Sequence, residues 1–374
     1  MKVPRLVATL VTALLAGCGP ATVATGDPSP SAVRNAPQRA YAVGVQQFVV
    51  DPGGPRPLPV TVWYPAAAPA TLPAPIPATR PAASTAAPNA PVVRPGAPVA
   101  AGRFPVVIYS HGLRALPEMH APLITRWAAA GFVVAAPTFP RTNQRARDFT
   151  RDDVRNQPAD CWRLIRQLVR LDTRLSDPLA GHLAVDRIAA AGHSAGGYTT
   201  AGMFSAGHSA RLRAGIVLAG GELPGGFAGP VAPLLFVHGS ADPTVPESVG
   251  RAAYAHAPGP AAFLSLTGQN HGAYLTPGHA GFPQVLATTT DFLRWTLYDD
   301  RAALHRLPTD AHLPNVTTLT THHLPPLTPV TLPPPALGRS WSSGAGRMGQ
   351  ITWIGHHGSM IDRVGLPRSP GVLG

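Results

Sequence analysis

The stretch Arg187-Ile-Ala-Ala-Ala-Gly-His-Ser-Ala-Gly-Gly-Tyr198 decides the fold of this chain. An apolar run ends in the pattern G-x-S-x-G, and a segment of small, helix-compatible residues follows. A strand that turns into a helix within a few residues strains the backbone of its serine, and flanking glycines remove Cβ atoms that would collide. Ser194 is therefore the candidate nucleophile. The N–H of Ala195, at the start of the helix, is a candidate donor to an oxyanion.

The five-residue pattern alone is common in a chain rich in glycine and alanine, so a chance loop is the alternative unless partners exist. Two loops downstream supply them. A buried strand at Pro233–Gly239 is followed by Asp242, and a strand at Ala261–Leu266 is followed by His271. A serine hydroxyl needs a general base, and the base needs a carboxylate that orients it. We therefore expect a triad of Ser194, Asp242 and His271.

A third loop lies upstream of the serine. The run Phe104–Gly112 reads as a strand that ends in His-Gly, and the next residue is Leu113. The second donor to an oxyanion is expected on the N–H of Leu113, directly after His-Gly. His111, His193 and His238 are expected to be structural.

From about Ala42 to Thr321 the chain resembles the α/β-hydrolase superfamily, whose triad follows the same order. Four phrases resemble the chlorophyllase, PET hydrolase and cutinase-like, and platelet-activating-factor acetylhydrolase group: Leu58–Pro65, Ser110–Gly112, Gln157–Asp160 and Gly192–Gly197. The resemblance implies an α/β-hydrolase fold, with a mostly parallel, twisted sheet of about eight strands and helices on both faces. It also implies hydrolysis of carboxylic esters.

One departure concerns polyesters. PET hydrolases carry an aromatic residue after the oxyanion His-Gly and a tryptophan after the strand that follows the elbow, whereas Leu113 and Gly220-Gly221 stand here. Polyester cleavage is therefore not expected.

Hydrophobic periodicity predicts further elements around these loops. Strands are expected at 42–50, 58–64, 132–136 and 214–219, and helices at 116–130, 158–171 and 283–297. Glu118 and His120 fit either a solvated helix start or the oxyanion region. Asp160 is expected in a first helical turn and Asp291 inside a helix, so neither competes with Asp242 for the acid.

Composition limits the partners. The formal net charge is +12, but Lys2 is the only lysine and the arginines are scattered, so no nucleic-acid partner is expected. Only two cysteines exist, which excludes a cysteine-based zinc site, and Cys161 fits a buried apolar position. No metal or other cofactor is expected. We expect a monomer acting on a small-molecule or lipid ester.

The N-terminus reads as a secretory signal, because a short apolar run, Leu6 to Leu15, follows Lys2 and Arg5. Leu15-Ala-Gly-Cys18 resembles the lipobox of bacterial lipoproteins, so residues 1–17 are expected to be removed and Cys18 lipidated. An ordinary signal peptide with a later cleavage site is the alternative. The chain is thus expected outside the cytoplasm, either anchored to the outer face of the bacterial cytoplasmic membrane or secreted.

The remaining segments frame one catalytic domain at 41–323. A disordered tether is expected at 18–40, and a Pro/Ala-rich insertion without apolar period at 65–102. Residues 324–374 lack periodicity and are expected to be disordered; a C-terminal overrun or a gate over the cleft are the alternatives.

The expected activity is a serine esterase that works through an acyl-enzyme. A thioesterase or acyltransferase would use the same triad, and a non-catalytic binding protein on a hydrolase scaffold is the alternative from another class.

Overall fold

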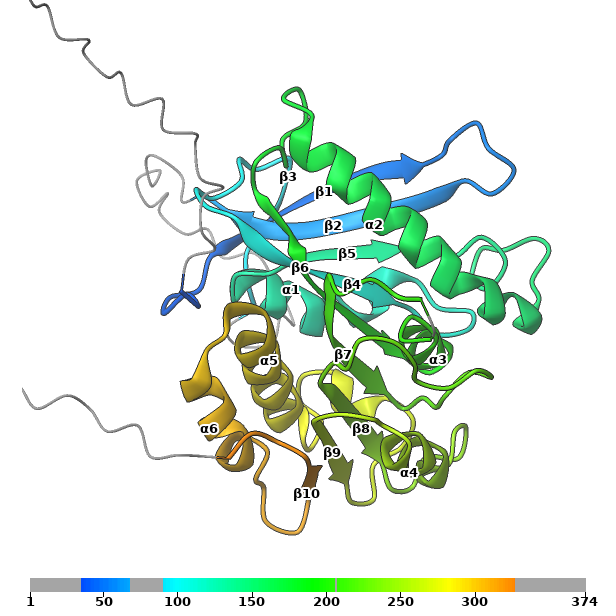
Figure 1. Cartoon of the computed structure of the whole chain (residues 1–374), viewed down its shortest axis with the longest axis vertical. Coiled ribbons are helices and arrows are strands. Elements are labelled where there is room, and N and C mark those ends of the chain that lie inside the picture. The colour runs from blue at the N-terminus through cyan, green and yellow to red at the C-terminus, as the bar shows by residue number, and fades with distance from the viewer. Residues whose placement is uncertain (1–34, 68–89, 206, 327–374) are drawn as a thin grey trace, which may run out of the picture. The chain divides into compact units, whose positions relative to one another are not determined.

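The computed structural model describes residues 35–67, 90–205 and 207–326 (Figure 1). The expected signal segment, Cys18 and nearly all of the tail at 324–374 lie outside these ranges. The described part of the chain has ten strands: β1 (Ala42–Val50), β2 (Leu58–Ala66), β3 (Val93–Pro95), β4 (Phe104–Ser110), β5 (Val133–Pro137), β6 (Leu183–His193), β7 (Leu212–Leu218), β8 (Leu234–Gly239), β9 (Ala261–Leu266) and β10 (Thr317–His322).

Six α-helices and three 3₁₀ turns connect the strands of the described ranges. The helices are α1 (Ala121–Ala129), α2 (Gln157–Thr173), α3 (Ala195–Gly202), α4 (Glu247–Ala255), α5 (Phe282–Tyr298) and α6 (Arg301–Asp310). The 3₁₀ turns are η1 (Pro117–His120), η2 (Arg151–Asn156) and η3 (Ala273–Leu275). No helix in the described part of the chain combines the length and apolar character required to span a bilayer.

All strands belong to one sheet in the order β10-β9-β8-β7-β6-β4-β5-β2-β1-β3. The six central strands, from β9 to β5, pair in parallel, whereas β1, β2 and β10 join by antiparallel pairing. In parallel pairs all carboxyl ends lie at one edge, and Ser110 at the end of β4 pairs with Gly192 near the end of β6. This register brings the loops after β4, β6, β8 and β9 to one edge of the sheet.

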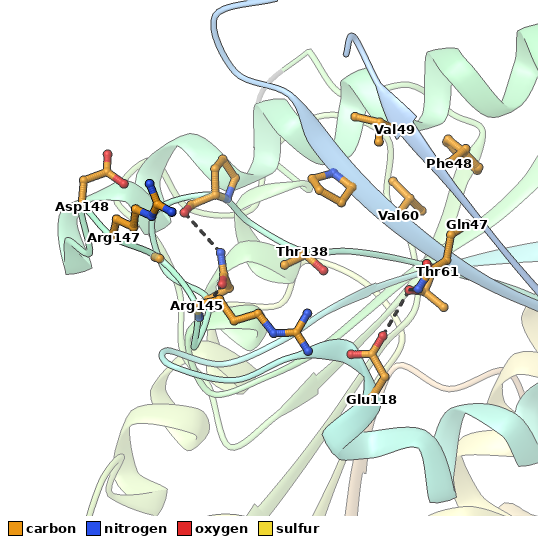
Figure 2. A pocket seen from close by; sticks show the side chains of 14 residues that line it. Gln47, Phe48, Val49, Val60, Thr61, Glu118, Thr138, Arg145, Arg147 and Asp148 are labelled. Carbon is orange, nitrogen blue, oxygen red and sulfur yellow. Dashed lines mark hydrogen bonds between the residues drawn. The ribbon is translucent and has the colours of Figure 1, made fainter.

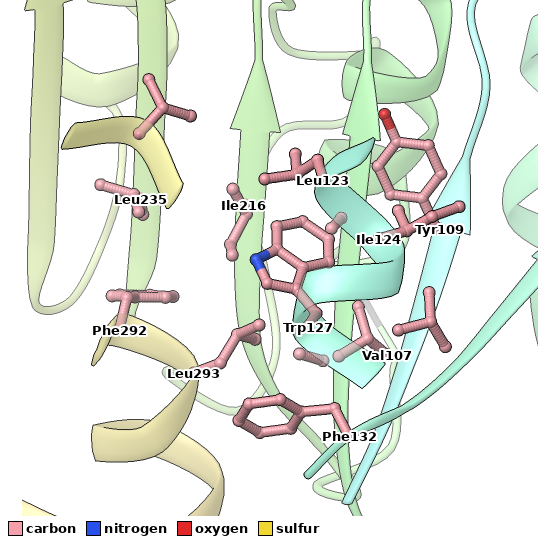
Figure 3. Close-up of a cluster of buried hydrophobic side chains, with 14 of the residues drawn as sticks. Val107, Tyr109, Leu123, Ile124, Trp127, Phe132, Ile216, Leu235, Phe292 and Leu293 are labelled. Carbon is pink, nitrogen blue, oxygen red and sulfur yellow. The ribbon is translucent and has the colours of Figure 1, made fainter. Parts of the chain in front are cut away.

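Helices cover both faces, as the fold requires for strands that are apolar on both sides. Side chains of α1, α5 and α6 pack in one buried cluster, and those of α2, α3 and α4 in another. Figure 3 shows the first cluster, where the fully buried Trp127 of α1 lies between strand residues such as Ile216 and the α5 residue Leu293. Its indole N–H donates to Thr289 Oγ1 at 3.1 Å, so the buried nitrogen keeps a partner.

The expected fold class is confirmed, and the antiparallel pair of β1 and β2 forms as expected. The described ranges contain ten strands, where about eight were expected. The short β3 lies within the Pro/Ala-rich insertion and pairs with β1, so residues 93–95 were wrongly expected to lack structure. The body of the domain also begins before residue 41, because Ala36 is buried and Arg294 donates to the Pro37 carbonyl at 3.0 Å.

Candidate active site

Ser194 lies between the end of β6 and the start of α3. Its backbone has φ 58° and ψ −122°, a conformation that non-glycine residues adopt only where the surrounding structure enforces it. Its N–H donates to the Leu218 carbonyl at 2.9 Å, which ties the turn to β7. The residue is partly exposed, whereas His193 and Ala195 on either side are buried. The fold thus presents Ser194 at the edge of the sheet in a strained turn.

The flanking glycines of the turn are sterically required. A Cβ on Gly192 would lie 2.2 Å from the Gly196 carbonyl oxygen, and a Cβ on Gly196 would lie 2.0 Å from the Ser110 carbonyl oxygen. Both contacts are with backbone, which cannot move aside cheaply. The loop after β4 also passes close by, since a Cβ on Gly112 would lie 3.2 Å from the Ser194 Cβ. The sequence pattern therefore reflects close packing of the turn against β4.

Asp242 and His271 are in direct contact, as expected from the sequence. His271 Nδ1 lies 2.7 Å from Asp242 Oδ2, and the Asp242 side chain is fully buried. The other oxygen, Oδ1, accepts from the N–H groups of Thr244 and Val245 at 2.8 and 2.9 Å. Burial alone would raise the pKa of Asp242, but these hydrogen bonds outweigh it and lower the pKa. An ionised Asp242 fixes the proton of His271 on Nδ1 and leaves Nε2 as the basic atom.

His193 holds the loop that carries His271. Its Nε2 lies 2.6 Å from the His271 carbonyl oxygen, and the two imidazole rings are 4.7 Å apart. Because a carbonyl only accepts, His193 carries its proton on Nε2. Since Ser194 directly follows His193, these contacts place His271 beside the nucleophile turn. His193 is thus structural, as expected.

His120 continues this buried group of histidines. Its ring lies 4.9 Å from that of His193, and its Nδ1 is 2.7 Å from the hydroxyl of Tyr109. His120 is therefore buried rather than part of a solvated helix start, whereas its neighbour Glu118 is exposed. Burial lowers the pKa of His120 to about 4 and that of His193 well below its usual value, so both are neutral near pH 7.

The loop after β4 forms a tight turn from Gly112 to Ala115. The Ala115 N–H donates to the Gly112 carbonyl at 3.3 Å, and Arg114 has a φ of 53°. His111 Nε2 accepts from the Phe139 N–H at 3.1 Å, so its proton sits on Nδ1, which donates to the Gly112 carbonyl at 2.7 Å. That carbonyl and the Leu113 N–H belong to the same planar peptide unit. His111 therefore sets the direction of the Leu113 N–H.

The two candidate oxyanion donors have no competing acceptor in the described turns and loops. Neither the Leu113 N–H nor the Ala195 N–H donates to a backbone carbonyl there. Ala195 begins α3, where N–H groups lack partners within the helix. Both groups are therefore available to a ligand beside Ser194.

A cavity of about 650 Å³ lies over the ends of β1 and β2, next to the loop after β5 (Figure 2). Apolar side chains of the strands line one side, including Phe48 and Val60, and Arg145 and Arg147 extend from the loop. Glu118 faces the cavity and accepts a hydrogen bond from Thr61 Oγ1 at 3.2 Å. The chemistry of this lining suits an apolar group that ends in polar atoms.

Metal binding has no support in the described part of the chain, where no three histidine, cysteine or acidic side chains converge as a ligand set. The neutral imidazoles near Ser194 are already engaged: His111 and His193 bind backbone groups, and His238 Nε2 lies 2.8 Å from the Val245 carbonyl. The ring nitrogens that make these contacts hold the loops in place.

Comparison with known families agrees with this architecture. Residues 74–214 match the family model described as Chlorophyllase. A search of curated proteins found no match.

The chain has the α/β-hydrolase fold and resembles chlorophyllases. This similarity indicates a hydrolase acting on esters. The matched segment of this chlorophyllase-like hydrolase includes β4, the turn at Gly112–Ala115 and the turn at Ser194, but it ends before Asp242 and His271. The assignment of the acid and the base therefore depends on the geometry given above.

The structure brings the loops of Ser194, Asp242 and His271, which the sequence had singled out, to one edge of the sheet, but sequence reasoning missed the residues that hold these loops. The tie from His193 to the His271 carbonyl joins residues 78 positions apart. The orienting role of His111 depends on Phe139, which lies in the following loop. The buried Asp160 lies in the first turn of α2, as expected, and both of its oxygens also lie 2.9 Å from Arg56 Nε, an ion pair that the sequence did not predict. The local sequence signal for this contact was the segment Gln157–Asp160, which resembles the same segment in related hydrolases.

Proposed function

We propose that this protein is a serine hydrolase that cleaves carboxylic esters through an acyl-enzyme. The observation that carries the proposal is the backbone conformation of Ser194 at the start of α3, beside a histidine whose Nδ1 is bound to a buried carboxylate. A serine in such a turn exposes its hydroxyl and stands next to the free N–H groups of a helix start.

In the proposed reaction, His271 Nε2 takes the proton of the Ser194 hydroxyl as its oxygen attacks the acyl carbon. Asp242 stabilises the resulting imidazolium through the 2.7 Å contact with Nδ1. The tetrahedral oxyanion accepts from the Leu113 and Ala195 N–H groups, and such a donor contributes about 3 kcal/mol to transition-state stabilisation. The imidazolium then protonates the leaving alcohol, and water activated by the same histidine releases the acid.

The cavity of Figure 2 supports an ester with an extended apolar arm. It borders the loop after β5, and that loop contacts the oxyanion turn because the Arg114 N–H donates to the Thr142 carbonyl at 2.7 Å. An arm that leaves the oxyanion site along this loop would reach the apolar side chains of β1 and β2. We do not propose polyester cleavage, because Leu113 and Gly220-Gly221 stand where PET hydrolases carry aromatic side chains.

We also propose export and anchoring through Cys18, which rests on the sequence Leu15-Ala-Gly-Cys18 after an apolar run. Lipoprotein maturation would supply the two or more acyl chains that stable anchoring needs. The enzyme would then meet its ester at the membrane surface.

Labelling with a fluorophosphonate probe tests the proposed function. The wild type should react at one residue, and Ser194→Ala and His271→Ala should lose both labelling and hydrolysis of p-nitrophenyl acetate. Ser209→Ala, which removes an exposed serine, is the matched control and should behave as wild type. An unlabelled wild type, or a Ser194→Ala variant that keeps more than a few per cent of turnover, would exclude the proposal. A parallel panel of oxygen esters, thioesters and alcohol acceptors separates an esterase from a thioesterase or acyltransferase.

A further inference from the structure

A buried polar bridge runs between the loop after β5 and α3. It consists of Thr142, Gln157 and Thr199, whose side chains are fully buried. Gln157 Nε2 donates to Thr142 Oγ1 at 2.7 Å, and Gln157 Oε1 accepts from Thr199 Oγ1. An unpaired buried amide is costly, so the Gln157 side chain is confined to the position in which both ends are bonded.

One end of the bridge leads to the Leu113 donor. The Thr142 carbonyl accepts from the Arg114 N–H at 2.7 Å, and Arg114 is the positive-φ residue of the turn that presents Leu113. A second backbone bond joins the same two loops, from the Gln144 N–H to the Ala115 carbonyl at 3.2 Å. The position of Thr142 therefore fixes the position of the turn.

The other end leads to the Ala195 donor. Thr199 lies one turn into α3, four residues after Ala195, so the helix itself joins the two residues. The single hydroxyl hydrogen of Thr199 is shared between Gln157 Oε1 and the Ala195 carbonyl, which lies 3.0 Å from Oγ1. Gln157 thus contacts the helix through a residue that is itself tied to Ala195. The two N–H groups come from segments about 80 positions apart. The bridge joins these segments through side chains, with Gln157 at its centre.

Gln157 can serve as a fixed point because the start of α2 is held independently. Arg56, in the link between β1 and β2, binds Asp160 of α2, and its guanidinium also binds the buried Asp153 at 2.6 Å. The ion pairs raise the pKa of Arg56, so the arginine stays charged. Paired, hydrogen-bonded charges of this kind hold a segment in one place.

We propose that Gln157 is a positioning residue that sets the spacing between the two oxyanion donors. This inference rests on the proposed function, since it assigns a role within the same site. An oxyanion is stabilised only when both donors lie about 2.7 to 3.1 Å from its position. A shift of one segment relative to the other would leave ground-state binding nearly unchanged and weaken only the transition state.

The test compares variants that cut the bridge with one that removes an unrelated buried hydroxyl. Gln157→Leu cuts both ends, whereas Thr142→Val and Thr199→Val each cut one end without changing side-chain shape. Thr289→Val is the matched control, because this fully buried threonine bonds Trp127 in the other core cluster. Thermal stability, kcat, KM, and inhibition by a trifluoromethyl ketone, which forms a tetrahedral adduct, are measured for each.

For Gln157→Leu we expect kcat to fall about tenfold, with KM within about twofold of the wild type, and the inhibition constant of the ketone to rise in parallel with the fall in kcat. Thr142→Val and Thr199→Val should reproduce part of the loss and be non-additive when combined, and Thr142→Ser and Thr199→Ser should restore activity. Thr289→Val should lose stability alone. A Gln157→Leu variant that loses stability but keeps kcat, as is expected of Thr289→Val, would overturn the inference. If Gln157→Leu does not fold, Thr142→Val and Thr199→Val are judged by the same criterion, and unchanged kcat in both would overturn it.

Hydrogen exchange separates this inference from the proposed function. In Gln157→Leu, amides in segments 111–116 and 194–200 should both exchange faster than in the wild type, and in Thr289→Val neither should. Unchanged exchange in both segments refutes the coupling even if the wild type is an esterase. An inactive, unlabelled wild type refutes the proposed function, and the exchange result still decides whether Gln157 couples the two segments.

Discussion

Two substitutions of His111 test how the oxyanion turn is held. The imidazole uses both nitrogens: Nδ1–H donates to the Gly112 carbonyl at 2.7 Å, and Nε2 accepts from the Phe139 N–H at 3.1 Å. Asparagine places an amide nitrogen near the position of Nδ1, and glutamine places an amide oxygen near that of Nε2. His111→Asn therefore keeps the bond to Gly112, whereas His111→Gln keeps the bond to Phe139.

Both variants should lose similar stability, because each leaves one buried backbone group without its partner, a cost of about 1 to 3 kcal/mol. Their activities should differ. Only His111→Gln frees the peptide that carries the Leu113 N–H, and a donor of this kind contributes about 3 kcal/mol, so complete loss corresponds to a fall of about 100-fold in kcat. Partial misdirection predicts a fall of about 10- to 100-fold for His111→Gln and less than about 3-fold for His111→Asn.

The assay is steady-state hydrolysis of p-nitrophenyl acetate at pH 7, with urea unfolding of the same preparations. The reasoning requires that kcat separates the two variants while the free energy of unfolding does not. Equal kcat values for His111→Asn and His111→Gln, or a larger loss in His111→Asn, would refute the role of the Gly112 carbonyl in aiming the Leu113 N–H.

Three further results are expected. Burial lowers the pKa values of His111 and His120 to about 4, so between about pH 6.5 and 4 the unfolded chain binds more protons than the folded one. The free energy of unfolding should therefore fall by about 2 kcal/mol per histidine from pH 7 to pH 5. Urea unfolding at both pH values checks this, and the free energy of unfolding of His111→Asn should fall by about one histidine's share less. Ala146→Trp narrows the cavity of Figure 2 and should raise KM several-fold for p-nitrophenyl decanoate but not for p-nitrophenyl acetate. Ala302→Trp, at an exposed position, is the control and should change neither KM value. Equal effects of Ala146→Trp on both esters would count against an acyl-binding site in the cavity. Cys18→Ser should shift the protein from the detergent phase to the aqueous phase, and a wild type whose intact mass shows no lipid would contradict the anchor.

The sequence predicted the parts of the fold that depend on local patterns. Continuous apolar runs identified β4, β5, β7, β8 and β9, because a strand buried on both faces needs no polar alternation. Helix α4 was missed, since Gly250 in its middle lowers helix propensity. The structure explains that glycine: a Cβ there would lie 2.4 Å from His238 Nδ1, so the helix can approach β8 only without a side chain at this position.

Elements that depend on distant partners could not be predicted. Strand β3 has three exposed residues and exists through pairing with β1, and α6 carries Pro308 within its length. The pairing of Arg56 with Asp160 joins residues 104 positions apart. No periodicity encodes such a contact, since it arises when the packed sheet brings a hairpin loop to the start of a helix. The candidate triad was accessible because each member follows a strand, whereas its supports come from unrelated segments.

The neutral histidines around the site have an electrostatic consequence for the proposed mechanism. His271 must become a cation during turnover, and the ring of His193 lies only 4.7 Å away. A protonated His193 would oppose that cation by about 3.5 kcal/mol at an effective dielectric constant near 20. Burial lowers the pKa values of His111, His120, His193 and His238, so these imidazoles supply hydrogen bonds without adding charge near pH 7. The same burial that stiffens the loops therefore leaves the partly exposed His271 as the histidine of this group best placed to accept the proton of Ser194.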